Sequence, residues 1–234
     1  MSEIWSTEHD GLRLDHAVAR ADGEGPKPAV LIFHSWAGRG PIEEKVAADF
    51  AAVGRVGIAC DLYGEGRTGS RPEECGALMA TLKDDRALLR RRLLHVFEQA
   101  AARPDVDADR IAAIGFCFGG LCALDLARAG APARGVAAMH GLFDPPGLDQ
   151  PAIRAKVIAF HGWDDPMAPP EAVTALAEEL TAAGADWQVH AFGNTKHAFT
   201  NPNANSPESG LLYDEKAAKR AWAGLDHFLG EVLA

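Results

Sequence analysis

Short apolar segments alternate with amphipathic ones along the chain, and joints that contain glycine or proline separate them. Uninterrupted apolar runs are typical of strands buried on both faces of a sheet. Such runs predict strands at residues 28–34, 56–60, 110–114, 135–139, 157–160 and 187–191. Residues 3–8 and 12–19, joined at Asp10-Gly11, predict an N-terminal hairpin.

Helical patterns lie between these runs, at residues 42–52, 121–127, 170–183 and 213–233, and over most of 70–101 after a Ser-Arg-Pro start signal. Strands that alternate with helices predict an α/β fold, with a mostly parallel twisted sheet and helices on both faces. None of the joints has the composition of an interdomain linker, and 234 residues suffice for one large core. We therefore expect residues 1–234 to form a single domain.

In such sheets, ligands bind beyond the carboxyl ends of the strands. One of these strand ends carries the most informative segment, Ile114-Gly115-Phe116-Cys117-Phe118-Gly119-Gly120. It reads G-x-C-x-G, which is the nucleophile elbow of α/β-hydrolases with cysteine in place of serine. A strand would turn sharply into a helix at Cys117, and only glycine fits cheaply beside so crowded a turn. At the helix N-terminus the backbone dipoles favour a thiolate.

A cysteine nucleophile needs a base, and the base needs a group that orients it. The order in α/β-hydrolases is nucleophile, acid, histidine. The loop after residue 160 offers Asp165 and Asp164, and Asp165 is preferred because it ends a Gly-x-x-Asp turn before a proline. His197 follows the last predicted strand. The alternatives are a buried structural thiol at Cys117, a turn or capping role for Asp165, and a plain surface position for His197.

With these motifs the chain resembles the dienelactone hydrolase family over nearly its whole length. The resemblance is carried by the G-F-C-F-G-G elbow, the H-G-W-D-D-P-M-A-P-P loop, the K-H-A-F-T-N-P loop and the D-L-Y-G turn. It implies a Cys117–His197–Asp165 triad that hydrolyses lactones or small activated esters through a thioester. The oxyanion would then be held by the backbone amides of Phe118 and Trp36.

The chain differs from the best-known members of this family in two respects. Those members have a glutamate beside the resting nucleophile where this chain has Ser35. They also hold a substrate carboxylate with two arginines, of which one maps near Arg71 and the other to Asn201. Ser35, Arg71, Trp163 and Phe199 are the candidate substrate-binding residues. Core packing is the alternative role for the aromatic residues.

Composition restricts the classes of molecule that the protein is expected to bind. The net charge of −10 argues against nucleic acid and anionic membrane surfaces. No signal-peptide pattern or bilayer-length apolar run is present, and four cysteines without a C-x-x-C pair suggest a reducing cytoplasm. We expect no metal or other cofactor, and a monomer or weak homodimer acting on a small ester or lactone. Two alternatives remain, an acyl-transfer or carbon–halogen hydrolase on the same fold and a non-catalytic binding protein.

Overall fold

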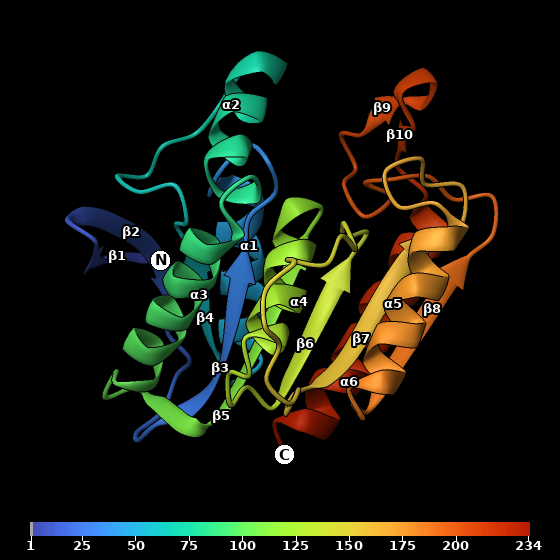
Figure 1. Cartoon of the computed structure of the whole chain (residues 1–234). Helices are drawn as coiled ribbons and strands as arrows, with labels where there is room; N and C mark the ends of the chain where they lie inside the picture. The colour runs from blue at the N-terminus through green and yellow to red at the C-terminus, as the bar shows by residue number, and fades with distance from the viewer. Residues whose placement is uncertain (1) are drawn as a thin grey trace.

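The computed structural model describes residues 2–234, which form an eight-stranded sheet in the order β1-β2-β4-β3-β5-β6-β7-β8 (Figure 1). The strands are β1 (Glu3–His9), β2 (Leu12–Ala19), β3 (Lys27–Phe33), β4 (Val56–Cys60), β5 (Val106–Phe116), β6 (Gly135–Met139), β7 (Lys156–Gly162) and β8 (Trp187–Phe192). Strands β3 to β8 run parallel to their neighbours, whereas the β1–β2 hairpin and the β2–β4 pairing are antiparallel. The predicted mostly parallel sheet is thus confirmed.

Helices cover both faces of this sheet, as predicted (Figure 1). They are α1 (Pro41–Ala52), α2 (Pro72–Lys83), α3 (Arg86–Ala101), α4 (Phe118–Arg128), α5 (Pro170–Ala182) and α6 (Glu215–Val232). Buried residues of α1 and α6 share one core cluster, and those of α2 to α5 share the other. No helix within residues 2–234 combines the length and apolar composition needed to cross a membrane.

Two segments differ from the expected pattern. The helical stretch at 70–101 is interrupted after Lys83, because the Asp85 carboxylate accepts a hydrogen bond from the Leu88 N–H and so starts a second helix. A small antiparallel pair, β9 (Asn205–Ser206) and β10 (Leu211–Leu212), was not predicted. It lies beyond the carboxyl edge of the sheet (Figure 1), and we refer to residues 205–212 as the edge hairpin.

A group of paired charges, the arginine cluster of Arg86, Asp125, Arg128 and Glu179, joins helices α3, α4 and α5. Arg86 Nη2 lies 2.7 Å from Asp125 Oδ1, and Arg128 Nη2 lies 2.6 Å from Glu179 Oε2. Arg128 also donates to the backbone carbonyls of Phe143 and Asp144, so it fastens the loop after β6 to helix α4.

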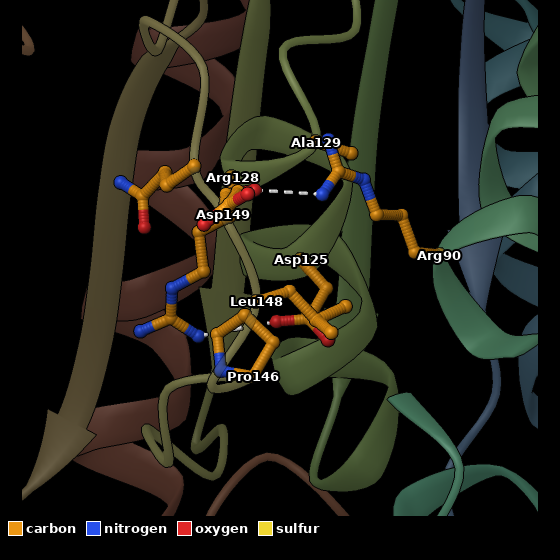
Figure 2. Close-up of a pocket in the computed structure, with 8 residues that line it drawn as sticks. Arg90, Asp125, Arg128, Ala129, Pro146, Leu148 and Asp149 are labelled. Atoms are coloured by element: carbon orange, nitrogen blue, oxygen red, sulfur yellow. Dashed lines mark hydrogen bonds and ion pairs between the residues drawn. The ribbon is translucent and has the colours of Figure 1, made fainter. Parts of the chain in front are cut away.

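Figure 2 shows a neighbouring space, where the side chain of Arg90 reaches the Asp149 carbonyl across the same loop. Its volume of about 10 Å³ is roughly that of one water-sized probe, so it cannot hold a substrate. The arginine cluster and this gap are therefore parts of the scaffold.

Candidate active site

The turn between β5 and α4 has the geometry of a strained elbow. Cys117 has φ 56° and ψ −117°, a left-handed φ that a residue with a side chain rarely adopts. A Cβ on Gly115 would lie 1.9 Å from the Gly119 carbonyl oxygen, and one on Gly119 would lie 2.1 Å from that of Phe33. These contacts leave no room for any residue other than glycine, so the predicted elbow is present and presents Cys117 at the N-terminus of α4.

His197 and Asp165 form a buried pair at the same edge of the sheet. His197 Nδ1 lies 2.7 Å from Asp165 Oδ2, and both side chains are almost completely buried. The second carboxylate oxygen of Asp165 accepts a hydrogen bond from the Met167 N–H, which fixes its orientation. The side chain of Asp164, the alternative acid, is exposed, and the Asp164 backbone N–H donates to the Thr195 carbonyl. The structure therefore pairs His197 with Asp165, as preferred from the sequence.

Four buried histidines lie at this edge, His34, His140, His161 and His197, and only one favours the protonated form. Burial lowers the pKa of His34. Burial lowers the pKa of His140 well below its ordinary value, and burial also lowers that of His161. Burial lowers the pKa of His197 as well, but its hydrogen bond to Asp165 and the neighbouring Cys117 outweigh this and raise the pKa to about 10. His197 is thus the one that can take and hold a proton.

Polar atoms without partners collect around this pair. Among residues 2–234, no hydrogen-bond partner reaches His197 Nε2, His140 Nδ1 or either ring nitrogen of His161. Buried polar groups in proteins are nearly always paired, so each exception needs an explanation. Because Nδ1 of His197 is held by Asp165, its Nε2 is the atom free to exchange a proton with Cys117 or a bound molecule.

A cavity of about 460 Å³ opens over Cys117 and His197. This volume is in the range of small-molecule binding sites. Its walls come from the loop after β3, the start of α1, helices α2 and α6, and the chain from residue 198 to the edge hairpin. The lining residues are Ser35, Trp36, Ile42, Glu43, Met79, Phe116, Cys117, His140, Leu142, Met167, His197, Ala198, Thr200, Asn201, Pro202, Asn203, Ala204, Asn205, Ser206, Leu211 and Trp222.

The predicted substrate-binding residues separate into two groups. Ser35 lines the cavity, as do Trp36 and Asn201. Arg71 does not, because it precedes α2 as its N-cap residue and its exposed side chain pairs with Glu74. The structure therefore does not bring Arg71 to the wall of the cavity that holds Cys117, and its role toward a substrate stays a prediction.

Two aromatic residues of the same prediction also lie outside the cavity wall. Trp163 is largely exposed on the loop after β7. Phe199 is fully buried, where its ring packs edge-on against His140 and Phe192. Core packing, the alternative for these residues, is what the structure shows for Phe199.

Sequence reasoning missed one charged residue of the cavity. Glu43 is buried at the third position of α1, where its carboxylate accepts hydrogen bonds from the N–H groups of Gly40 and Ser35. The available signal was a capping pattern, in which a glutamate three residues into a helix bonds back to the N-cap amide. That signal predicts a helix start, and says nothing of which cavity the carboxylate faces.

Two backbone N–H groups, that of Phe118 next to Cys117 in the chain and that of Trp36 in the cavity wall, have no acceptor within residues 2–234. Phe118 is the first residue of α4, so its N–H has no partner in the helix. The Tyr63 hydroxyl donates to the Trp36 carbonyl and so holds the Trp36 loop from the other side. Such fixed, unpaired N–H groups can bind an oxyanion.

The residues described, 2–234, contain no group of three or more histidine, cysteine, aspartate or glutamate side chains that could hold a metal ion. The groups that converge on the cavity are a thiol, an imidazole paired with a carboxylate, and free amides. These are the parts required for acyl transfer through a covalent intermediate.

The sheet, the elbow and the histidine loop together define an α/β-hydrolase. The model of the dienelactone hydrolase family matches residues 14–233, and the chain belongs to that family. It is 26% identical over 232 residues to a provisionally named carboxymethylenebutenolidase of Aquifex aeolicus, with 95% of each chain covered.

Two solved structures resemble the whole chain. The structure of m3DLH is 32% identical and superposes with a TM-score of 0.92, covering 100% of this chain and 99% of the other. That of a dienelactone hydrolase-like promiscuous phosphotriesterase from metagenomic libraries is 31% identical, with a TM-score of 0.91 and the same coverage. The chain is therefore a hydrolase of this family.

Proposed function

We propose that this protein hydrolyses small carboxylic esters or lactones, with Cys117 as the nucleophile, His197 as general base and acid, and Asp165 as the group that orients His197. The observation that carries the proposal is the arrangement at one cavity. A strained cysteine at a helix N-terminus shares that cavity with a histidine whose other nitrogen is bound to a buried carboxylate.

The proposed reaction begins when His197 Nε2 takes the thiol proton and Cys117 Sγ attacks the carbonyl carbon. The negative charge that develops on the carbonyl oxygen is bound by the N–H groups of Phe118 and Trp36. As the intermediate collapses, the C–O bond breaks, His197 returns the proton to the leaving alkoxide, and the acyl group remains on Cys117 as a thioester. In a lactone the alcohol stays attached to the acyl chain.

Water then completes the cycle. His197 takes a proton from a water molecule, whose oxygen attacks the thioester carbon, and the carboxylic acid leaves as the thiol is restored. Throughout, Asp165 keeps the Nδ1 proton of His197 in place and stabilises the imidazolium.

A second candidate substrate class is neutral phosphotriesters. The observation that favours it is the 31% identity to a promiscuous phosphotriesterase whose structure covers this whole chain. The same thiolate would attack phosphorus and the same amides would face a phosphoryl oxygen. The two classes can be compared directly with a p-nitrophenyl carboxylic ester and a p-nitrophenyl dialkyl phosphate.

The test is steady-state hydrolysis of p-nitrophenyl acetate and a panel of lactones that includes dienelactones, by the wild type and Cys117→Ala. We expect turnover that disappears in the variant, together with a transient acyl adduct on Cys117 in intact-mass spectra. Equal turnover by both proteins would contradict the proposed nucleophile.

The remaining alternatives have their own readouts. Acyl transfer to an added alcohol, or halide release from a haloalkanoate, would indicate a related reaction on the same site. Thermal stabilisation by a ligand that is never turned over, with a Cys117 that resists acylation, would indicate a binding protein.

A further inference from the structure

We infer that Glu43 sets the charge preference of the cavity, so that a substrate with a positive charge beside the scissile ester is favoured over its neutral isostere, and one with a carboxylate there is rejected. This inference rests on the proposed function and names the substrate class that the site selects.

The position of Glu43 is the first argument. Its residue is only 4% exposed, and it lies in the wall of the cavity that holds Cys117. Each of its oxygens accepts one hydrogen bond from a backbone N–H, at 3.0 Å from Gly40 and 3.4 Å from Ser35. A carboxylate can accept about four, so capacity remains for a cation or donor in the cavity.

The absence of a compensating charge is the second argument. No lysine or arginine belongs to the wall of this cavity among residues 2–234. The two nearby arginines of the sequence are engaged elsewhere, since Arg39 pairs with Glu44 and Arg71 pairs with Glu74. Glu43 therefore faces the cavity with no cation to neutralise it.

The charges of the proposed triad do not reverse the negative potential that Glu43 creates in the cavity. With a neutral histidine and a thiol, Asp165 alone carries a charge, for a sum of −1. With an imidazolium and a thiolate the charges are −1, +1 and −1, and the sum is again −1. With an imidazolium and a thiol the charges of Asp165 and His197 cancel. The triad therefore either adds to the negative potential that Glu43 creates or leaves it unchanged, and in no arrangement does it reverse that potential.

The rest of the wall suits a cation. Trp36, Trp222 and Phe116 contribute aromatic rings to it. Aromatic faces attract quaternary and primary ammonium groups, and tryptophan does so best. Apolar walls also screen a charge less than water does, so the effect of one carboxylate on a bound ion is large.

A purely structural role would account for less. Glu43 caps helix α1 through Gly40, but an exposed carboxylate serves as a cap equally well. Burial of a carboxylate without a cation is costly, and here two backbone N–H groups and the N-terminal end of α1 offset part of that cost. A cap would also leave the order of cationic, neutral and anionic substrates unchanged, which makes the two roles separable.

The experiment compares three phenyl acetates that carry a para trimethylammonio, tert-butyl or carboxylate group. In 0.5 M salt, which screens the net charge of the molecule, kcat/KM is measured for the wild type, Glu43→Gln and Asp49→Asn. Asp49 is the matched control, because it lies exposed on the same helix and its substitution changes the net charge equally.

For each variant, kcat/KM for the two charged substrates is divided by kcat/KM for the tert-butyl substrate. We expect Glu43→Gln to raise this ratio for the carboxylate substrate by about tenfold and to lower it for the trimethylammonio substrate by a similar factor. Asp49→Asn should shift neither. Ratios cancel any general loss from a disturbed helix start. If Glu43→Gln moves both ratios by less than about twofold, or Asp49→Asn moves them as much, the inference is overturned.

A second measurement does not need the variant to fold. Choline, 3,3-dimethylbutanol and 3,3-dimethylbutyrate have nearly the same shape and differ in charge. Their inhibition constants against wild-type hydrolysis of p-nitrophenyl acetate therefore report the sign of the electrostatic potential in the cavity. We expect choline to bind most tightly and the carboxylate most weakly, and an equal or reversed order overturns the inference. Failure of the proposed nucleophile would appear separately, as hydrolysis that survives Cys117→Ala.

Discussion

Helix α4 has functional groups at each end, and their polar atoms are paired in opposite ways. At its C-terminal end, the arginine cluster gives every charge an opposite partner within hydrogen-bond distance. At its N-terminal end, Cys117 sits with strained dihedrals beside a histidine nitrogen that has no partner within residues 2–234. Every charge at the C-terminal end of α4 has a partner, whereas the N-terminal end faces an unpaired histidine nitrogen. We call the N-terminal end the open end.

This difference separates scaffold from site. A buried ion pair that is complete adds little by itself, but breaking it is expensive, so it acts as a fixed joint between helices. Unpaired buried groups and strained backbone lower stability and persist where a ligand or a reaction uses them. The two ends of α4 should therefore respond to substitution in different properties, activity at one and stability at the other.

The largest effect is expected from Cys117→Ala. Loss of the proposed nucleophile should reduce kcat by roughly 10⁴-fold or more, because the residues of such a triad act as a unit. The free energy of unfolding should change little, since Cys117 is only partly buried and packs at the margin of the core. Steady-state assays and urea denaturation of the same preparations measure both quantities.

Cys122→Ala is the control for that prediction, because Cys122 is a buried thiol on the same helix. It should retain activity and lose only some packing energy. A Cys122 variant as inactive as the Cys117 variant would remove the distinction between the two thiols.

At the other end of α4, Asp125→Ala should destabilise the fold by about 3–5 kcal/mol, because it leaves Arg86 and Arg128 buried with one carboxylate fewer. At a temperature where the variant is folded, kcat/KM should stay close to the wild-type value. Asp226→Ala, which removes an exposed carboxylate 3.7 Å from Arg55, should cost less than about 1 kcal/mol. Equal losses of unfolding free energy in the two variants would show that the arginine cluster stabilises the fold no more than a surface ion pair does.

Sequence reasoning predicted the parts of this comparison that depend on local pattern. Strands β4 and β6 agree with prediction to the residue, because both are wholly buried apolar runs. Strand β5 begins at Val106, earlier than predicted, because its polar start pairs with β3, a contact that local hydrophobicity does not report. Cys117, Asp165 and His197 could be found because each follows a strand whose carboxyl end faces the same edge.

The cavity wall was harder to predict. Glu43 is placed by the orientation of the first turn of α1, and the edge hairpin by long-range pairing, as when the His197 N–H donates to the Gly210 carbonyl. Neither has a periodic pattern. Arg71 lies outside the cavity wall because it is the N-cap residue of α2 and its pairing with Glu74 keeps its side chain at the surface, neither of which a local pattern reports.

The pH dependence of stability should sharpen the comparison at the open end. The pKa of His197 is raised from its ordinary value of 6.5 to about 10 in the folded state, so folding is favoured by its protonated form. That stabilisation is fully present below pH 6.5 and is lost as the pH rises through 10.

We expect the difference in unfolding free energy between the wild type and His197→Gln to fall by about 2 kcal/mol or more between pH 6 and pH 10. Urea denaturation at several pH values measures it. His227→Gln, at an exposed histidine of α6, is the control, and the fall for His197→Gln should exceed the change for this variant. A flat difference for His197→Gln would mean that Asp165 and Cys117 do not hold a proton on that ring.

The smallest effect tests how the edge hairpin supports the site. Gly210 has φ +78°, and a Cβ there would lie 2.2 Å from Cγ of Pro166, the residue after Asp165. Gly210→Ala should therefore push the hairpin away from the acid loop and strain the His197–Gly210 hydrogen bond, at a cost of about 1 kcal/mol in stability and several-fold in kcat.

Gly230→Ala is the matched control, because a Cβ at Gly230 meets nothing within 4 Å. It lies in helix α6, where alanine should stabilise the fold by about 0.5–1 kcal/mol and leave kcat unchanged. If Gly210→Ala lowers stability but not kcat, the hairpin is scaffold, like the arginine cluster. If kcat falls more than the loss of stability explains, the edge hairpin, a segment with no predicted structure, helps to position His197. The functional region at the N-terminal end of α4 then includes residue 210 on the other side of the cavity.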